Sequence, residues 1–166
     1  MKGDKFRHLT VFRDYGDIDK WYIEDFEKRF GYILPDTYKE LMLKHNGVRF
    51  EEDNFALDEE RFWTWNFLFD AFGEKELTKG DHIDEAQIGV SHPDYYGIPG
   101  LVCIASTGEG DLVCFDYRDE LKGNNPKVVV MIHDEYDKHE DGSITNKVTF
   151  VANTFDDFLD MLYEDV

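Results

Sequence analysis

Apolar residues recur at helical spacing between residues 23 and 30. Ile23, Phe26 and Phe30 occupy positions i, i+3 and i+7, so they form one stripe along a helix. Gly31 follows this stripe, and glycine readily adopts the left-handed conformation found at many helix ends. The pattern therefore predicts a short amphipathic helix that ends at Gly31.

A second helix is predicted directly after the first. Pro35 suits the first turn of a helix, and Asp36 is favourable at its positive end. The buried face of this helix is expected to contain Tyr38, Leu41, Met42 and His45. The dipeptide Asn46-Gly47 marks its end. Residues 23–47 thus predict two helices joined by a tight elbow.

The densest aromatic segment, residues 61–73, has the alternation of a strand. One parity contains Trp63, Trp65, Phe67 and Phe69. The positions on the opposite face include Phe62, Leu68 and Phe72, so both faces of the strand are expected to be buried. We interpret the segment as core and not as a ligand cage.

Further strands are predicted in the second half of the chain. Residues 101–105 and 112–117 are expected to form a hairpin with reduced, buried thiols at Cys103 and Cys114. The two thiols face each other if Gly108-Glu109 is the tip of the hairpin, whereas a register shift of one residue would place them on opposite faces. The aliphatic run 127–133 predicts a central strand, and residues 147–151 a short one. Residues 154–163 predict a closing helix with Thr154 as its N-cap. Residues 74–100, with several glycines and prolines, are expected to be connecting structure.

The order of these motifs resembles the SUKH superfamily. The matching elements are the LPxxY segment from Leu34, the Asn46-Gly47 pair, the Gly108-x-Gly110-Asp111 turn before Phe115-Asp116-Tyr117, and the closing VANTFDDFLDML. The resemblance implies an α+β fold in which a central, largely antiparallel sheet is packed by helices. It also implies a function, because many members are bacterial immunity proteins that neutralise a cognate toxin, often a nuclease. The superfamily includes a fungal regulator of cell-wall synthesis as well, so a regulatory scaffold that binds an endogenous protein is the alternative.

The length of 166 residues predicts one SUKH-like domain over residues 1–166, with residues 1–20 as a peripheral N-terminal extension. The first ten residues lack the apolar stretch of a secretion signal. The longest aliphatic run, residues 128–132, is too short to span a bilayer. These features predict a soluble, cytoplasmic protein without a membrane partner, and they leave the oligomeric state open.

The net charge of −19 narrows the class of partner. Phosphates would be repelled, so nucleic acid is excluded as a direct partner, and a basic protein such as a toxin is favoured. The predicted partner-binding residues are acidic and lie in two loops: Glu51, Glu52, Asp53, Asp58, Glu59, Glu60, Glu109 and Asp111. The alternative interpretation of each is solvated loop surface.

No catalytic constellation is apparent in the sequence. The region from His133 to Asp141 is rich in imidazole and carboxylate groups, and Asp137, His139, Asp141 and Gly142 resemble the start of a calcium loop whose first position is Asp137. However, the twelfth position of that loop is Val148, where a bidentate Glu is needed. The chain also lacks the HExxH, GxSxG and phosphate-loop motifs. We therefore predict a protein that is not an enzyme and has no metal or cofactor; a metal-dependent enzyme that uses this region is the remaining alternative.

Overall fold

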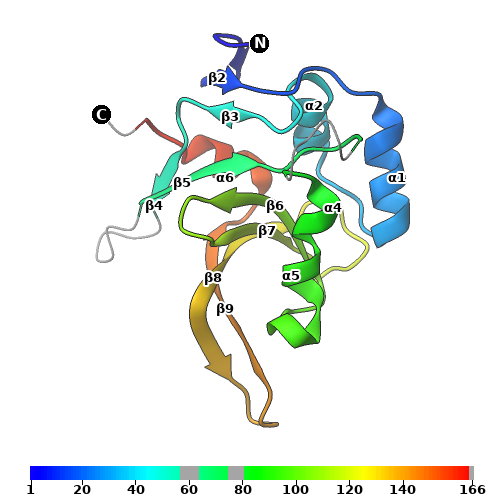
Figure 1. The fold of residues 1–166 in the computed structure, drawn as a ribbon, viewed down its shortest axis with the longest axis vertical. Helices are drawn as coiled ribbons and strands as arrows, with labels where there is room; N and C mark the ends of the chain where they lie inside the picture. Colours follow the sequence, from blue (N-terminus) through cyan, green and yellow to red (C-terminus); the bar gives the residue numbers. More distant parts are fainter. Residues whose placement is uncertain (57–63, 75–80, 165–166) are drawn as a thin grey trace.

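The computed structural model describes residues 1–56, 64–74 and 81–164. Within them, one sheet has the strand order β4 (Asn54–Ala56), β5 (Thr64–Phe69), β6 (Leu101–Thr107), β7 (Leu112–Asp116), β8 (Lys127–Lys138) and β9 (Ile144–Ala152). A smaller sheet has the order β1 (Lys5–Phe6), β2 (Leu9–Arg13) and β3 (Arg49–Phe50). All of these pairings are antiparallel (Figure 1). The predicted α+β fold with a central antiparallel sheet is confirmed.

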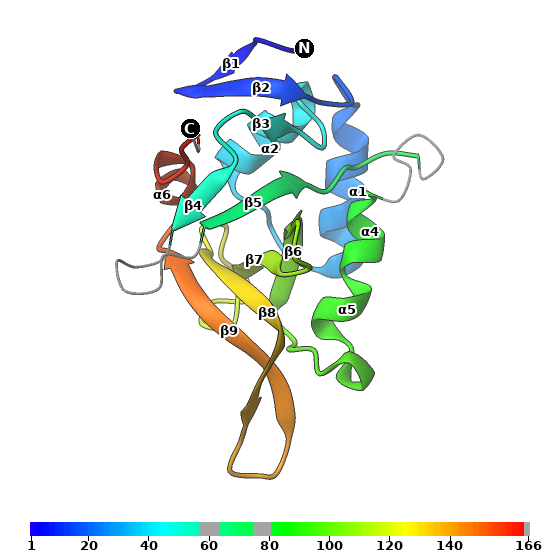
Figure 2. The same ribbon diagram turned by 60° about the vertical axis from the view of Figure 1, so that its left-hand side comes forward.

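Helices cover the larger sheet on both faces (Figures 1 and 2). The main core joins α1 (Lys20–Phe30), α2 (Asp36–Lys44) and α6 (Phe155–Asp160) to one face. A smaller core lies on the other face, beneath α4 (Ile83–Ala86) and α5 (Ile88–Ser91). Along β8, Val128, Val130 and Ile132 enter the main core, whereas Val129 and Met131 enter the smaller one. Burial on both faces explains why β8 begins as an uninterrupted aliphatic run.

The helix pair forms as the apolar pattern predicts. Gly31 has a φ of 81°, and its N–H donates to the carbonyl of Glu27 at 2.9 Å, which ends α1. The Glu27 carboxylate then accepts the N–H of Leu34 at 2.7 Å and fixes the elbow. Residues of the predicted faces are buried: Ile23, Phe26, Tyr38, Leu41, Met42 and His45.

Aromatic rings fill the main core. Tyr38 packs edge-on against Phe115 and Phe155, with ring centroids 5.1 and 5.5 Å apart. Phe67 and Phe69 of β5 are buried beside them, as predicted. The other face of β5 is more open, because Asn66 is exposed and Leu68 half-buried, so burial on both faces holds only in part. Phe62 and Trp63 lie outside the described residues.

Two regions contain more regular structure than the sequence pattern predicts. Residues 74–100, expected to be connecting structure, contain α4, α5 and the 3-10 turn η1 (Pro93–Tyr95). These elements are only three or four residues long, and such short pieces have no detectable apolar period. In residues 1–20, β2 places Leu9 and Val11 fully inside the main core.

The last strands and the last helix differ from the prediction in length. β8 and β9 are longer than predicted, and their hairpin projects from the body of the molecule (Figure 2). α6 ends at Asp160, earlier than predicted, while Thr154 caps it by accepting the N–H of Asp157 at 3.0 Å. None of the helices in the described ranges is long and apolar enough to cross a membrane.

Candidate partner-binding surface

The first predicted acidic stretch, residues 51–53, connects β3 to β4. The Glu52 carboxylate accepts the backbone N–H and the hydroxyl of Thr10, at 2.6 and 2.8 Å. Burial raises the pKa of Glu52, but these hydrogen bonds outweigh it and lower that pKa overall. Asp53 pairs with Arg49 at 3.2 Å. Glu52 and Asp53 are therefore held in place by neighbouring groups, and Glu51 lies half-buried next to them.

The other predicted residues of this loop, Asp58, Glu59 and Glu60, lie outside the described residues.

The second stretch, at the tip between β6 and β7, contains two carboxylates in different environments. Glu109 is exposed, whereas Asp111 is only 4% exposed. The Asp111 carboxylate accepts the backbone N–H of His133 at 3.0 Å and lies 2.6 Å from its Nδ1. That hydrogen bond raises the pKa of His133. Asp111 thus fastens the hairpin tip to β8, and the carboxylate that the tip presents to solvent is that of Glu109.

Strand β5 brings the two acidic stretches to one part of the molecule. The backbone N–H of Phe67 donates to the carbonyl of Asp53, and the carbonyl of Asn66 accepts the N–H of Gly108, both at 3.2 Å. Adjacent residues of one strand therefore contact both stretches. Because paired strands lie about 4.8 Å apart, the two stretches are separated by roughly 10 Å. Residues that are more than fifty positions apart in the sequence thus flank a single strand.

The histidines and carboxylates between His133 and Asp141 do not converge. His139 Nε2 lies 2.7 Å from the hydroxyl of Thr145, and the Asp141 carboxylate accepts the N–H and hydroxyl of Ser143. Within the described ranges, no group of three or more His, Cys, Asp and Glu side chains is arranged to hold a metal ion. These side chains are spread along an extended hairpin, which separates them.

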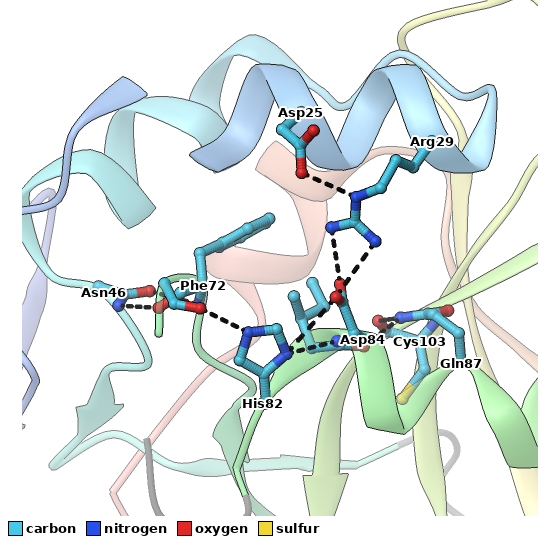
Figure 3. Close-up of polar contacts among 10 residues, drawn as sticks. Asp25, Arg29, Asn46, Phe72, His82, Asp84, Gln87 and Cys103 are labelled. Carbon is cyan, nitrogen blue, oxygen red and sulfur yellow. Dashed lines mark hydrogen bonds and ion pairs between the residues drawn. The ribbon is translucent and has the colours of Figure 1, made fainter. Parts of the chain in front are cut away.

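Two buried side-chain amides bind backbone groups: Asn46 binds the segment after β5, and Gln87 binds β6 (Figure 3). The Asn46 side chain donates to the carbonyl of Phe72 and accepts its N–H, both at 2.8 Å. In the same way, Gln87 donates to the carbonyl of Cys103 at 2.7 Å and accepts its N–H at 2.9 Å. Asn46 belongs to the motif that ends the helix pair, whereas no sequence signal marks Gln87.

Replacing Asn46 with alanine is expected to lower the free energy of unfolding by roughly 2–4 kcal/mol, because the N–H and carbonyl of Phe72 would lose their partners in a buried site. Urea denaturation would measure the loss. Asn125→Ala, at an exposed position, is the matched control and should change stability little. A loss of less than about 1 kcal/mol in Asn46→Ala would indicate that water replaces the amide.

A polar group is also buried under the smaller core. Asp70 is 6% exposed, and this burial raises its pKa to about 7. Its carboxylate lies 3.7 Å from the Sγ of Cys103. Cys103 and Cys114 are buried free thiols directly opposite each other in the β6–β7 register, as predicted. No pattern in the sequence indicated that Asp70 would be buried.

A cleft of about 240 Å³ lies beside α1. Trp21 and Tyr22 form part of its wall, and the Arg29 guanidinium lies between the carboxylates of Asp25 and Asp84, at 2.7 and 3.1 Å (Figure 3). The single positive charge of Arg29 offsets one of these two negative charges, so the cleft contributes little free negative charge for a basic partner.

Comparison with known proteins assigns a family to this arrangement. The model of the SMI1 / KNR4 family (SUKH-1) matches residues 17–161. The matched range includes the helix pair, the six-stranded sheet and α6. Searches of curated proteins and of solved structures returned no match. Members of the SUKH family are commonly immunity proteins. On the family match over most of its length, this chain belongs to the SMI1 / KNR4 family (SUKH-1).

Proposed function

We propose that this protein is a cytoplasmic immunity protein that neutralises a cognate toxin by binding directly to a basic surface of that toxin. Family membership supports the immunity role, and the net charge of −19 supports a basic partner. A nuclease toxin fits best, because an enzyme that binds phosphates needs positive charge around its active site. An acidic protein that covers this site blocks access of the nucleic acid.

The observation that carries the proposal is the pair of acidic stretches flanking β5. Residues 51–53 and the tip that presents Glu109 lie on one part of the molecule and are fixed by hydrogen bonds to Thr10, Asn66 and His133. Because these hydrogen bonds fix the backbone of both stretches before binding, the stretches lose little conformational freedom when a partner arrives. We keep Asp58, Glu59 and Glu60 in the proposal because they are acidic and follow the first stretch in the sequence after β4. In this arrangement Asp111 supports the tip from inside.

The proposed action is binding without catalysis. Opposite charges steer two proteins together, and association can reach about 10⁸–10⁹ M⁻¹s⁻¹ compared with about 10⁵–10⁶ M⁻¹s⁻¹ for neutral partners. Rapid capture matters for an immunity protein, because a free nuclease continues to cut its substrate until it is bound. No catalytic group is needed for this function.

Co-expression with the product of the adjacent gene tests the proposal. The expected result is that cells expressing both proteins grow, that cells expressing the adjacent gene alone do not, and that the two proteins elute together in gel filtration. Recovery of a housekeeping protein as the partner, with no effect on growth, would favour a regulatory scaffold. Protection of growth without a complex would contradict neutralisation by direct binding.

A further inference from the structure

Three exposed tyrosines lie where the β8–β9 hairpin meets the segment after α5, and the ring of the first, Tyr95, packs against His92 at 5.9 Å. Tyr95, Tyr96 and Tyr136 are 57%, 47% and 52% exposed. The rings of Tyr96 and Tyr136 are 5.2 Å apart at an angle of 69°, so they pack edge to face. We call these three residues the tyrosine cluster. Single exposed rings are common on protein surfaces, whereas several that gather in one place mark an interaction site.

The cluster is held by one residue of the neighbouring strand. Asn146 lies opposite Tyr136 in the β8–β9 pairing. Its backbone N–H donates to the carbonyl of Tyr96 at 2.9 Å, and its side-chain amide donates to the carbonyl of Tyr95 at 3.0 Å. These hydrogen bonds fix the backbone that carries Tyr95 and Tyr96, and the contact with Tyr136 orients the Tyr96 ring, so less conformational freedom is lost when another molecule binds.

Tyr96 also adopts an unusual backbone conformation. Its φ is +58°, a left-handed value that is uncommon for a bulky residue without a polar side chain near its backbone. Such conformations persist where the surrounding structure enforces them, and they concentrate at functional sites. The strained backbone, the hydrogen bonds from Asn146 and the exposed rings are separate observations that all indicate a prepared contact surface.

The charge around the cluster indicates which partner it fits. Carboxylates occur along the same hairpin, with Glu135 half-buried and the other four exposed: Asp134, Asp137, Glu140 and Asp141. Lys138 is also exposed on this hairpin, and Lys147 is paired with Glu135 at 3.7 Å, so the two lysines compensate only part of the charge of the five carboxylates. A second copy of this chain would bring a further −19 and would be repelled. A cationic partner is attracted.

We propose that the tyrosine cluster binds arginine side chains on the surface of a basic protein partner. The planar guanidinium stacks on aromatic faces, and its charge is attracted both to the rings and to the neighbouring carboxylates. Tyrosine and arginine dominate the residues that contribute most to protein interfaces. The inference rests on the proposed function, and it adds a second contact region: His133, bound to Asp111, connects the hairpin to the acidic tip.

Titration of the full chain with two peptides, nona-arginine and nona-lysine, tests this inference, because the peptides carry equal charge and differ in the ability to stack. Amide NMR shifts would locate the binding and give its affinity. We expect nona-arginine to bind more tightly and to shift the signals of residues 94–96 and 134–146. The double variant Tyr96→Leu/Tyr136→Leu is expected to weaken nona-arginine binding about tenfold and to leave nona-lysine binding nearly unchanged.

Two controls separate the rings from general effects. Tyr96→Phe/Tyr136→Phe keeps both rings and should retain the preference for arginine. If the leucine variant folds poorly, the phenylalanine variant still tests whether the rings or the hydroxyl groups carry this preference. Trp21→Leu removes an exposed ring in α1, away from the hairpin, and should change neither affinity.

Three results would overturn the inference. They are equal affinity of the two peptides, an arginine preference that survives in the leucine variant, and concentration-dependent dimerisation that the leucine variant abolishes. Equal, salt-sensitive binding of both peptides would leave electrostatic capture of a basic toxin intact. The co-expression experiment fails or succeeds independently of this titration.

Discussion

Replacing Asp70 with asparagine is expected to make the protein more stable at pH 8 and to leave its stability unchanged near pH 4. Burial raises the pKa of Asp70 from the usual 3.8 to about 7 in the folded state. Each pKa unit corresponds to about 1.4 kcal/mol, so ionising this carboxyl group costs the fold on the order of 4 kcal/mol. An asparagine has a similar shape and no charge, so it avoids that cost.

The direction of the pH dependence follows from the sign of the shift. A folded-state pKa above the unfolded value means that the folded protein holds the proton more tightly. The stabilisation from protonated Asp70 is complete below pH 3.8, decreases as the pH rises, and is lost above about pH 7. The advantage of Asp70→Asn should therefore grow between these two values and stay constant at higher pH.

Urea denaturation of both proteins from pH 4 to pH 9 measures this difference. Asp137→Asn, at an exposed position, is the matched control and should show no such trend. If the difference between Asp70→Asn and the native protein stays constant with pH, the Asp70 side chain titrates normally and its site must be open to water.

The second large effect concerns the binding of the basic partner. Association is expected to slow by about a hundredfold or more between 0.1 M and 1 M salt, while dissociation changes much less. The reason is that the Debye length falls from about 10 Å to about 3 Å over this range, so charges no longer attract a partner from a distance. Stopped-flow or surface-based kinetics with the co-expressed toxin would give both rate constants.

Charge variants assign this effect to the proposed surface. Neutralising the whole first acidic stretch would also remove Glu52 and Asp53, which hold Thr10 and Arg49, so these two are best kept. The test variant is Glu51→Gln, Asp58→Asn, Glu59→Gln and Glu60→Gln, and it should slow association about tenfold at 0.1 M salt. The matched control removes four exposed charges elsewhere: Glu24→Gln, Glu40→Gln, Glu85→Gln and Glu120→Gln.

A clear outcome separates capture by this surface from a general effect of net charge. If the test variant and the control slow association equally, the −19 charge acts as a whole and the loop has no special part. If neither variant nor added salt alters association, electrostatic capture is wrong and the interface is apolar.

The sequence by itself determined the elements whose signals are local. The apolar stripe before Gly31, the Thr154 cap and the opposed Cys103 and Cys114 all occur as predicted. Each depends on residues within a few positions, or on a short hairpin, so spacing alone specifies it. The ordered motifs were also sufficient to indicate the family, which the match over residues 17–161 confirms.

The tertiary structure alone decided the environment of each polar group. Asp111 and Glu109 are two residues apart in one acidic turn, yet His133, 22 positions from Asp111, buries and binds the first while the second stays in water. Asp70 has a raised pKa because distant segments exclude water from it, and Asn146 orders tyrosines about fifty residues before it. Solvation and hydrogen bonding depend on all neighbours in space, and sequence patterns report only neighbours along the chain.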